Sequence, residues 1–177
     1  MRHLMLLRHA KSAWTETGMD DRDRPLTPRG QRAAQAMGQV MRDRGLLPDL
    51  ILCSPAKRAR ETWALVAEGL KTAPKTLVDE TIYDFGNGGR IAKAVAQHGG
   101  DAATVLIVGH NPSLERLANR LAKAGSAKLR DRLEKKFPTA ALAVIDFDIE
   151  DWAALDGATG DLSHFIRPRD VLATGQD

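Results

Sequence analysis

The chain has 177 residues, of which 43% are hydrophobic and 28% are charged, a balance typical of a soluble globular protein long enough to bury a core. Its net charge of +3 fits an anionic ligand but is too small to indicate nucleic acid as a partner. Apolar runs such as 4–7 and 105–108 are far shorter than a membrane span, and no N-terminal stretch is apolar enough for a signal peptide. The single cysteine, Cys53, excludes an internal disulfide and favours a reducing, cytoplasmic location.

The sequence contains no internal repeat, low-complexity tract or long linker, so we expect a single domain over 1–177. The predicted strands, in chain order, are 3–7, 50–53, 104–108, 140–147 and 162–166. The predicted helices are 28–44, 55–70, 88–98 and 112–124. Because strands alternate with helices of this length, the pattern predicts an α/β fold, a three-layer α/β/α sandwich around a mostly parallel sheet.

Three predicted helices begin with the same pair, a capping residue followed by proline: Thr27-Pro28, Ser54-Pro55 and Asn111-Pro112. The second and third pairs follow a predicted strand, and Arg8-His9 also ends one. The carboxyl ends of parallel strands lie along one edge of a sheet, where ligands bind. The sequence therefore predicts that Arg8-His9, the basic turn SPAKRAR and the segment GHNP meet at this edge.

Together these segments contain two histidines, His9 and His110, and at least two arginines. The cations Lys57, Arg58 and Arg60 lie in the first turn of the predicted helix 55–70, where the helix dipole opposes positive charge. A bound anion would offset that repulsion. Guanidinium groups bind phosphate through paired hydrogen bonds, so the segments predict a phosphate pocket.

Other phosphate chemistries fit the sequence less well. A cysteine phosphatase would need arginine at the position of Ala59, six residues after Cys53. The acids Asp146 and Asp148 come late in the chain and lack the residues that follow an aspartyl nucleophile, so we interpret them as solvated acids of an outer strand. The segment GNGG lacks the lysine and hydroxyl of a phosphate-binding loop. No spacing among the histidines indicates a zinc site.

The segments LMLLRHAKS, DRPLTPRG, ILCSPAKRARET and VGHNPSLE, in this order, resemble the motifs of the histidine phosphatase superfamily, also called phosphoglycerate mutase-like. The similarity is greatest to the short SixA-type phosphohistidine phosphatases. The motifs span about 4–116, and weaker similarity in FPTAALAVIDF and GDLSHFIRPRDVL extends nearly to the C-terminus. The resemblance implies a phosphoglycerate mutase-like fold and a phosphatase that needs no metal or other cofactor. The family's usual glycine after the RH pair is Ala10 here, for which we expect a slightly tighter loop.

The resemblance also implies roles for the predicted site residues. His9 would be the nucleophile, forming a phosphohistidine intermediate that water then hydrolyses. The phosphate-binding groups would be Arg8, Arg58 and His110, which stabilise the charge that develops on the phosphoryl oxygens. Nearby arginines would keep His9 unprotonated near neutral pH. The family spacing S-P-x-x-R selects Arg58, although Arg60 and Lys57 are close enough to line the pocket.

The general acid has three candidates. In many relatives a glutamate between the second arginine and the GHN motif protonates the leaving oxygen, and Glu80 best matches its position. Asp79 and Asp84 lie close enough in sequence to compete. A phosphoramidate P–N bond is labile, so cleavage of phosphohistidine depends less on a strong acid than cleavage of an ester does.

The short chain leaves little length for a lid over the pocket, and the main loop available is 14–24. An open pocket favours a phosphorylated protein, carrying phosphohistidine, as substrate and partner. A small phosphate ester is the alternative substrate. A third interpretation, from a different class, is a non-catalytic module that recognises phosphorylated partners. We expect neither nucleic acid nor a membrane as a partner.

Overall fold

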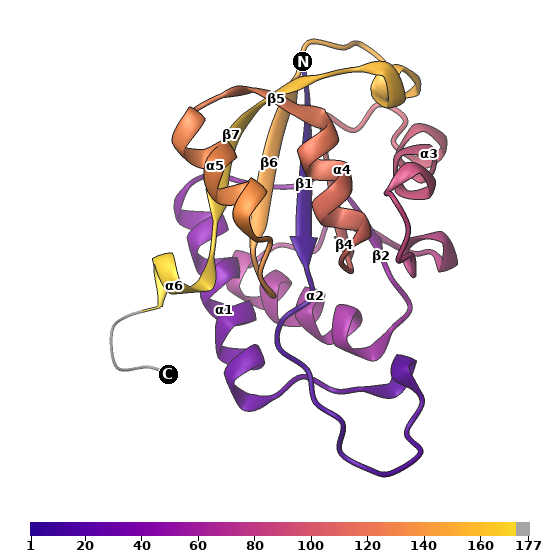
Figure 1. Cartoon of the computed structure of the whole chain (residues 1–177), viewed down its shortest axis with the longest axis vertical. Coiled ribbons are helices and arrows are strands. Elements are labelled where there is room, and N and C mark those ends of the chain that lie inside the picture. Colours follow the sequence, from indigo (N-terminus) through magenta and orange to yellow (C-terminus); the bar gives the residue numbers. More distant parts are fainter. Residues whose placement is uncertain (173–177) are drawn as a thin grey trace.

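The computed structural model describes residues 1–172, in which a mixed seven-stranded sheet carries helices on both faces (Figure 1). The strand order is β3-β2-β4-β1-β6-β7-β5. The strands are β1 (Arg2–Arg8), β2 (Leu50–Cys53), β3 (Lys75–Val78), β4 (Thr104–Gly109), β5 (Ala122–Gly125), β6 (Leu142–Phe147) and β7 (Gly160–Ile166). The α-helices are α1 (Pro28–Asp43), α2 (Lys57–Leu70), α3 (Gly89–His98), α4 (Ser113–Leu121), α5 (Ala127–Lys135) and α6 (Pro168–Val171). Short 3-10 helices are η1 (Asp21–Asp23), η2 (Glu80–Ile82) and η3 (Trp152–Gly157).

The central strand β1 separates two hydrophobic clusters, because successive residues of a strand point to opposite faces. Leu4 and Leu6 pack with residues of α3, α4 and α5, whereas Met5 and Leu7 pack with residues of α1 and α2. All four side chains are buried. The three-layer α/β/α architecture expected from the sequence is therefore confirmed. None of the described helices is long and apolar enough to cross a membrane.

The parallel half of the sheet brings three strand ends to one edge. Strands β1 and β2 both pair in parallel with β4. The backbone N–H of His9 donates to the carbonyl of Gly109 at 3.0 Å, and that of Ser54 donates to the carbonyl of Val108 at 3.0 Å. These bonds fix the residue that follows each strand at the edge predicted for ligand binding. In Figure 1 this edge lies at the lower end of β1, from which the segment before α1 projects.

The last residue of β2, Cys53, is a free thiol that is only 1% exposed. Its Sγ lies 3.4 Å from the carbonyl oxygen of Ser54. Burial raises the pKa of this thiol to about 12. The thiol is therefore protonated at physiological pH and is no nucleophile.

The sheet has four parallel strand pairs and two antiparallel ones, because β6 runs antiparallel to both β1 and β7. The sequence analysis did not predict β3, β5 or α5. The helix expected over 112–124 ends at Leu121, and the next four residues form β5. Most residues of β3 and β5 are exposed, so their sequences lack the apolar alternation that reveals a strand.

Of the three predicted helix caps, only the one at Thr27 is confirmed, where Oγ1 accepts a hydrogen bond from the N–H of Gly30 at 3.0 Å. The cap predicted at Ser54 is wrong, because α2 begins at Lys57. The hydroxyl of Ser54 instead lies 2.7 Å from Nε2 of His110. A strand-end serine is thus used by the predicted site rather than by the helix.

The cap predicted at Asn111 is also wrong. The Asn111-Pro112 peptide bond is cis, and α4 begins at Ser113. The amide of Asn111 donates to the carbonyl of Phe137 at 2.9 Å. Asn111 therefore joins the end of β4 to the loop before β6 instead of capping α4.

Candidate active site

His9 follows the last residue of β1 and is 8% exposed. Its Nδ1 lies 2.8 Å from the carbonyl oxygen of Ala10, which can only accept a hydrogen bond, so the ring proton is on Nδ1. Burial lowers the pKa of His9 to about 3. The hydrogen bond to Ala10 opposes this shift, whereas the charges of Arg58 and Arg8 add to it. Nε2 therefore carries a lone pair and no proton at neutral pH, and it accepts a hydrogen bond from Nε of Arg58.

Arg58 lies in the first turn of α2 and is 2% exposed. Its Nε lies 3.4 Å from Nε2 of His9, and its Nη2 lies 3.3 Å from Nδ1 of His110. The guanidinium group thus spans both predicted histidines. An oxygen of an anion placed between the rings would meet this group directly.

His110 follows β4 and is 1% exposed. The centroids of its ring and the His9 ring are 5.2 Å apart. Burial, with the nearby His9 and Arg58 adding to its effect, lowers the pKa of His110 to about 3. Nη2 of Arg58 can only donate, so Nδ1 of His110 accepts that hydrogen bond and the ring proton is on Nε2, which donates to the hydroxyl of Ser54 at 2.7 Å. The ring is thus held between Ser54 and Arg58.

Arg8 is the last residue of β1, and its Nη1 donates to the carbonyl of Phe137 at 3.0 Å. Its Nε is buried and has no hydrogen-bond partner among residues 1–172. Burial lowers the pKa of this guanidinium, with Glu115 opposing the shift and Arg58 adding to it. A buried donor without a partner costs free energy, and a bound anion would satisfy it. The four groups predicted to bind and attack phosphate are thus brought together.

The strand-end loop that contains Ala10 is held by Thr62 of α2. The backbone N–H of Ala10 donates to Oγ1 of Thr62 at 2.9 Å, and that hydroxyl donates to the carbonyl of Arg58 at 2.6 Å. Within residues 1–172, the non-glycine residues with positive φ are Lys71 and Ala140. Ala10 therefore adopts an ordinary backbone conformation that needs no glycine.

Asp21 of η1 is a site residue that the sequence analysis missed. Its carboxylate accepts hydrogen bonds from Nη2 of Arg58 at 2.9 Å, from the hydroxyl of Tyr83 at 2.5 Å and from Nη1 of Arg24 at 3.1 Å. Burial alone would raise the pKa of Asp21, but these hydrogen bonds outweigh it and lower the pKa to about 2. The carboxylate is thus ionised throughout the physiological range and complements Arg58. In the sequence, Asp21 is the first residue of the segment DRDRPLTPRG, and its place in that segment is the signal that could have indicated it.

The three acid candidates occupy different environments. The side chain of Glu80 is 68% exposed and pairs with Arg22, whose guanidinium lies 4.3 Å from the ring centroid of Tyr83. Tyr83 in turn lies against His110, with centroids 5.3 Å apart. Glu80 therefore lies on the rim of the site, connected to it through Arg22 and Tyr83.

Asp79 and Asp84 have other partners. The carboxylate of Asp79 accepts from the backbone N–H of Thr81 at 2.8 Å and lies 3.2 Å from Nε2 of His98. The carboxylate of Asp84 accepts from the N–H of Gly86 at 3.3 Å. Both carboxylates therefore stabilise the segment around η2, which favours Glu80 as the remaining acid candidate.

Lys57 and Arg60, the other cations of the SPAKRAR turn, have partners on their own helix or its approach. Nζ of Lys57 lies 4.0 Å from the carboxylate of Glu61, and Nε of Arg60 donates to the carbonyl of Pro55 at 3.0 Å. Arg58 is thus the cation of this turn that faces the histidines. Residues 1–172 contain no group of three or more His, Cys, Asp or Glu side chains that could hold a metal ion.

A site of this kind can accept a phosphoryl group on an imidazole nitrogen and then transfer it to water, while guanidinium groups stabilise the negative charge on the phosphoryl oxygens. This chemistry is that of a phosphohydrolase. A sequence profile of the histidine phosphatase superfamily (branch 1) matches residues 4–88.

Three relatives resemble the chain over most of its length. An uncharacterized protein of Mycobacterium tuberculosis is 36% identical over 165 residues, which cover 92% of this chain and 100% of that protein. The structure of a proposed phosphohistidine phosphatase SixA from Nakamurella multipartitia is 33% identical, has a TM-score of 0.78 and covers 94% of this chain and 96% of its own. A corresponding structure from Agrobacterium tumefaciens is 29% identical, with a TM-score of 0.77 and coverages of 94% and 98%.

The chain therefore belongs to the histidine phosphatase superfamily and is of the SixA type. The resemblance found in the sequence motifs is confirmed, as are the phosphoglycerate mutase-like fold and the phosphohydrolase activity that it implied. The interpretation as a non-catalytic phosphate-binding module is not retained.

Proposed function

We propose that the protein hydrolyses phosphohistidine on a protein partner and that His9 is the nucleophile. The observation that carries this proposal is the unprotonated Nε2 of His9, which lies 3.4 Å from Nε of the buried Arg58. A lone pair that faces a fixed guanidinium is positioned to attack a phosphorus atom whose oxygens bind that guanidinium.

The reaction has two balanced steps. In the first, Nε2 of His9 forms a bond to phosphorus, the P–N bond to the substrate imidazole breaks, and the released imidazole takes up a proton. In the second, the oxygen of a water molecule forms a bond to phosphorus, the P–N bond to His9 breaks with its electron pair returning to Nε2, and both protons of the water leave with the inorganic phosphate. Arg8, Arg58 and His110 hold the phosphoryl oxygens through both steps.

The exposed rim supports a protein as the substrate. Phe85 is 45% exposed, and its ring centroid lies 5.0 Å from that of His110. Trp14, in the loop before η1, is 58% exposed and lies against the guanidinium of Arg24. Exposed aromatic side chains beside a site are common anchors for protein partners. The two SixA structures named above are those of proposed phosphohistidine phosphatases.

The exposed position of Glu80 is compatible with an imidazole as the leaving group. A substrate imidazole can take its proton from solvent, so an exposed carboxylate on the rim is sufficient as a proton source. We propose Glu80 as an assisting acid rather than an essential one. A cytoplasmic location and the absence of a cofactor remain predictions.

Phosphoenzyme trapping tests the proposal. The wild-type protein and His9→Ala are mixed, in excess chelator, with a phosphohistidine-carrying protein domain and separately with an aryl phosphate. We expect an acid-labile, alkali-stable phosphoenzyme in the wild type only, and faster dephosphorylation of the protein domain. Labelling of His9→Ala would contradict the assigned nucleophile. Slow reaction with the domain beside fast hydrolysis of the aryl phosphate would instead indicate a small phosphate ester as the substrate.

A further inference from the structure

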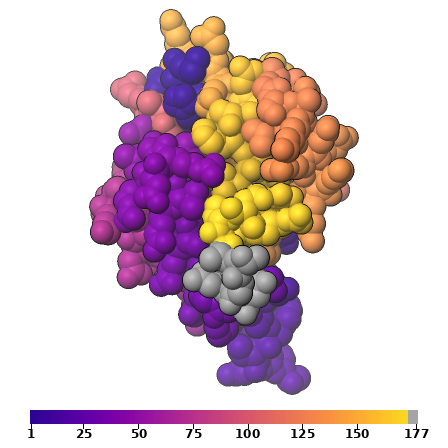
Figure 2. Space-filling model, turned by 90° about the vertical axis from the view of Figure 1, so that its left-hand side faces the viewer, coloured from indigo at the N-terminus to yellow at the C-terminus, as the bar shows by residue number. Residues whose placement is uncertain are grey.

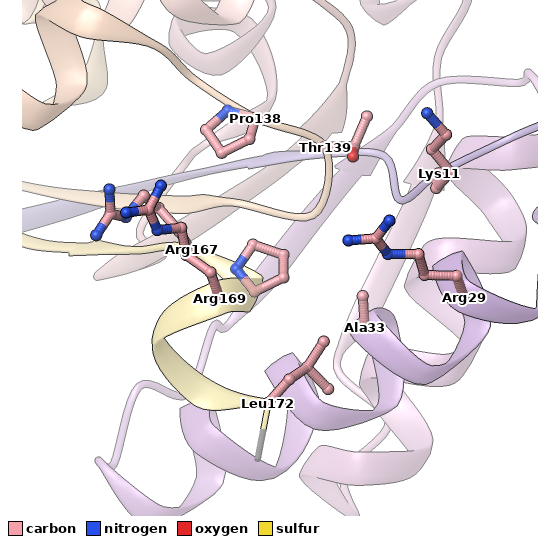
Figure 3. A pocket seen from close by; sticks show the side chains of 9 residues that line it. Lys11, Arg29, Ala33, Pro138, Thr139, Arg167, Arg169 and Leu172 are labelled. Atoms are coloured by element: carbon pink, nitrogen blue, oxygen red, sulfur yellow. The ribbon is translucent and has the colours of Figure 1, made fainter. Parts of the chain in front are cut away.

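A second cationic pocket lies on the α1 side of the sheet, outside the phosphate site. Its cavity has a volume of about 260 Å³ (Figure 3). The lining residues come from the loop after His9, from α1, from the loop before β6 and from α6: Lys11, Arg29, Ala33, Pro138, Thr139, Arg167, Pro168, Arg169 and Leu172. Figure 2 shows the surface on which α1, in violet, meets the yellow α6 segment.

The charges lining this pocket are all positive. Figure 3 shows Lys11 and Arg29 on one side of the pocket and Arg167 and Arg169 on the other. Arg167 is paired with Asp170, its Nε and Nη2 lying 2.9 and 2.8 Å from the carboxylate oxygens. Lys11 and Arg169 are exposed and have no acidic partner among residues 1–172. Lys11 and Arg169 therefore present positive charge to a molecule that approaches the pocket.

The rest of the lining is apolar, with Ala33, Pro138, Pro168 and Leu172 between the cations. A small inorganic anion would leave these apolar groups uncovered, whereas a carboxylate on an aliphatic stem covers them. The cavity, about 260 Å³ in volume, is smaller than most pockets for small organic ligands. These properties fit one acidic side chain of a polypeptide.

The pocket is joined to the catalytic edge through the backbone. Lys11 lies two residues after His9, so their Cα atoms are at most roughly 7 Å apart. On the opposite side, the N–H of Ala140, which follows Thr139, donates to the carbonyls of Arg8 and His9 at 3.1 Å each. The pocket therefore adjoins the two loops that hold Arg8 and His9.

The motif DRPLTPRG builds this arrangement. Gly30 packs so closely on Lys11 that a Cβ at residue 30 would lie 2.2 Å from the Lys11 carbonyl oxygen. The backbone N–H of Thr27 donates to that same oxygen at 2.9 Å. The start of α1 is thus fixed against the loop after His9, which places Arg29 beside Lys11.

We propose that this pocket binds an acidic side chain next to the phosphohistidine of the partner protein, so that the enzyme selects phosphohistidine sites with an acidic neighbour. The inference rests on the proposed function and specifies the substrate sequence that the same site prefers. Charge complementarity of this kind sets specificity and association rate more than raw affinity.

Paired phosphohistidine peptides test the inference. The members of each pair differ only in Glu or Gln, which is placed at successive positions on either side of the phosphohistidine. The measurement is the ratio of kcat/KM for the Glu peptide to that for the Gln peptide, because this ratio does not depend on the fraction of folded enzyme. We expect a wild-type ratio of about ten at the best position, decreasing with added salt.

Charge variants provide the controls. Arg169→Glu and Lys11→Gln should bring the ratio to about one or below. Lys128→Glu, a charge reversal on the exposed surface of α5, should leave it at the wild-type value. A wild-type ratio near one at every position, or a ratio that Arg169→Glu leaves unchanged, would overturn the inference.

Two further outcomes separate the inference from the function on which it rests. Hydrolysis of an aryl phosphate without dephosphorylation of either peptide would refute both. Dephosphorylation of both peptides at equal rates would refute only the acidic pocket. A third outcome is that Arg169→Glu loses hydrolysis of 3-phosphoglycerate while its peptide ratio stays unchanged. This result would assign the pocket to a small ester that carries two anionic groups, and it would overturn the binding of a protein side chain there.

Discussion

Asp21 binds Arg58 through two different groups. Its backbone carbonyl accepts from Nη1 at 2.6 Å, and its carboxylate accepts from Nη2 at 2.9 Å. Two hydrogen bonds in one plane fix the orientation of a guanidinium group. The Nε of Arg58 is thereby directed at Nε2 of His9. The loop before α1 thus acts as a positioning element for the buried cation of the site.

We expect Asp21→Asn to lower kcat/KM for an aryl phosphate about tenfold, because the charge-assisted hydrogen bond that orients Arg58 is lost. The measurement is steady-state kinetics with active sites counted from the phosphoenzyme burst, so that unfolded protein does not contribute. Asp23→Asn removes the same charge from an exposed position two residues later in η1 and is the matched control. Equal kinetics in the two variants would refute the positioning role.

The histidines should make folding stability depend on pH. His9 and His110 have folded-state pKa values of about 3, whereas histidines of an unfolded chain titrate near 6.5. Between these values the unfolded state binds more protons, so the free energy of unfolding falls as pH falls. We expect a lower urea midpoint at about pH 5 than at about pH 7. The His9→Asn variant should show a smaller difference, and a midpoint that rises toward low pH would contradict the buried neutral histidines.

The hydroxyl of Ser54 should matter for turnover more than for binding. Ser54→Ala removes the hydrogen bond at Nε2 of His110, so the ring loses the partner that fixes its orientation in the pocket. We expect kcat to fall about tenfold, with a small change in KM. Ser163→Ala removes a serine hydroxyl far along the chain on β7 and is the control. An unchanged kcat in Ser54→Ala would show that His110 is oriented by other contacts.

Gly30 and Gly157 form a matched pair for stability. A Cβ at Gly30 would lie 2.2 Å from a backbone oxygen of Lys11, whereas a Cβ at Gly157 would meet nothing within 4 Å. We expect Gly30→Ala to destabilise the fold by about 2 kcal/mol or more, because backbone cannot move aside as a flexible side chain can. Gly157→Ala should change the free energy of unfolding by less than about 0.5 kcal/mol. Equal urea midpoints would contradict the close approach of α1 to the loop after His9.

The sequence predicts the catalytic edge well because its groups follow buried strands. Arg8, His9 and His110 come directly at the ends of apolar runs, and parallel pairing alone brings them together. The basic turn after β2 brings Arg58 to the same edge. The groups predicted to bind and attack phosphate can therefore be identified from local sequence patterns and one topological rule.

Other parts of the molecule depend on contacts that no local pattern shows. Asp21 lies in a loop whose position is determined by its bonds to Arg58 and Tyr83, both distant in sequence. The exposed strand β3 is recognisable only through its pairing with β2. Ser54 carries the ordinary signal of a helix cap, and only the nearby ring of His110 shows its actual use. Tertiary contacts therefore determine the groups that support the site.

The buried thiol of Cys53 has a consequence for the conditions under which the enzyme can work. Peroxide attacks thiolates, and phosphatases that use a thiolate nucleophile are switched off when that sulfur is oxidised. Here the proposed nucleophile is an imidazole, and the single thiol of the chain is 1% exposed with a pKa raised to about 12. Dephosphorylation by this protein should therefore continue during oxidative stress, when enzymes with a catalytic thiolate are inactivated.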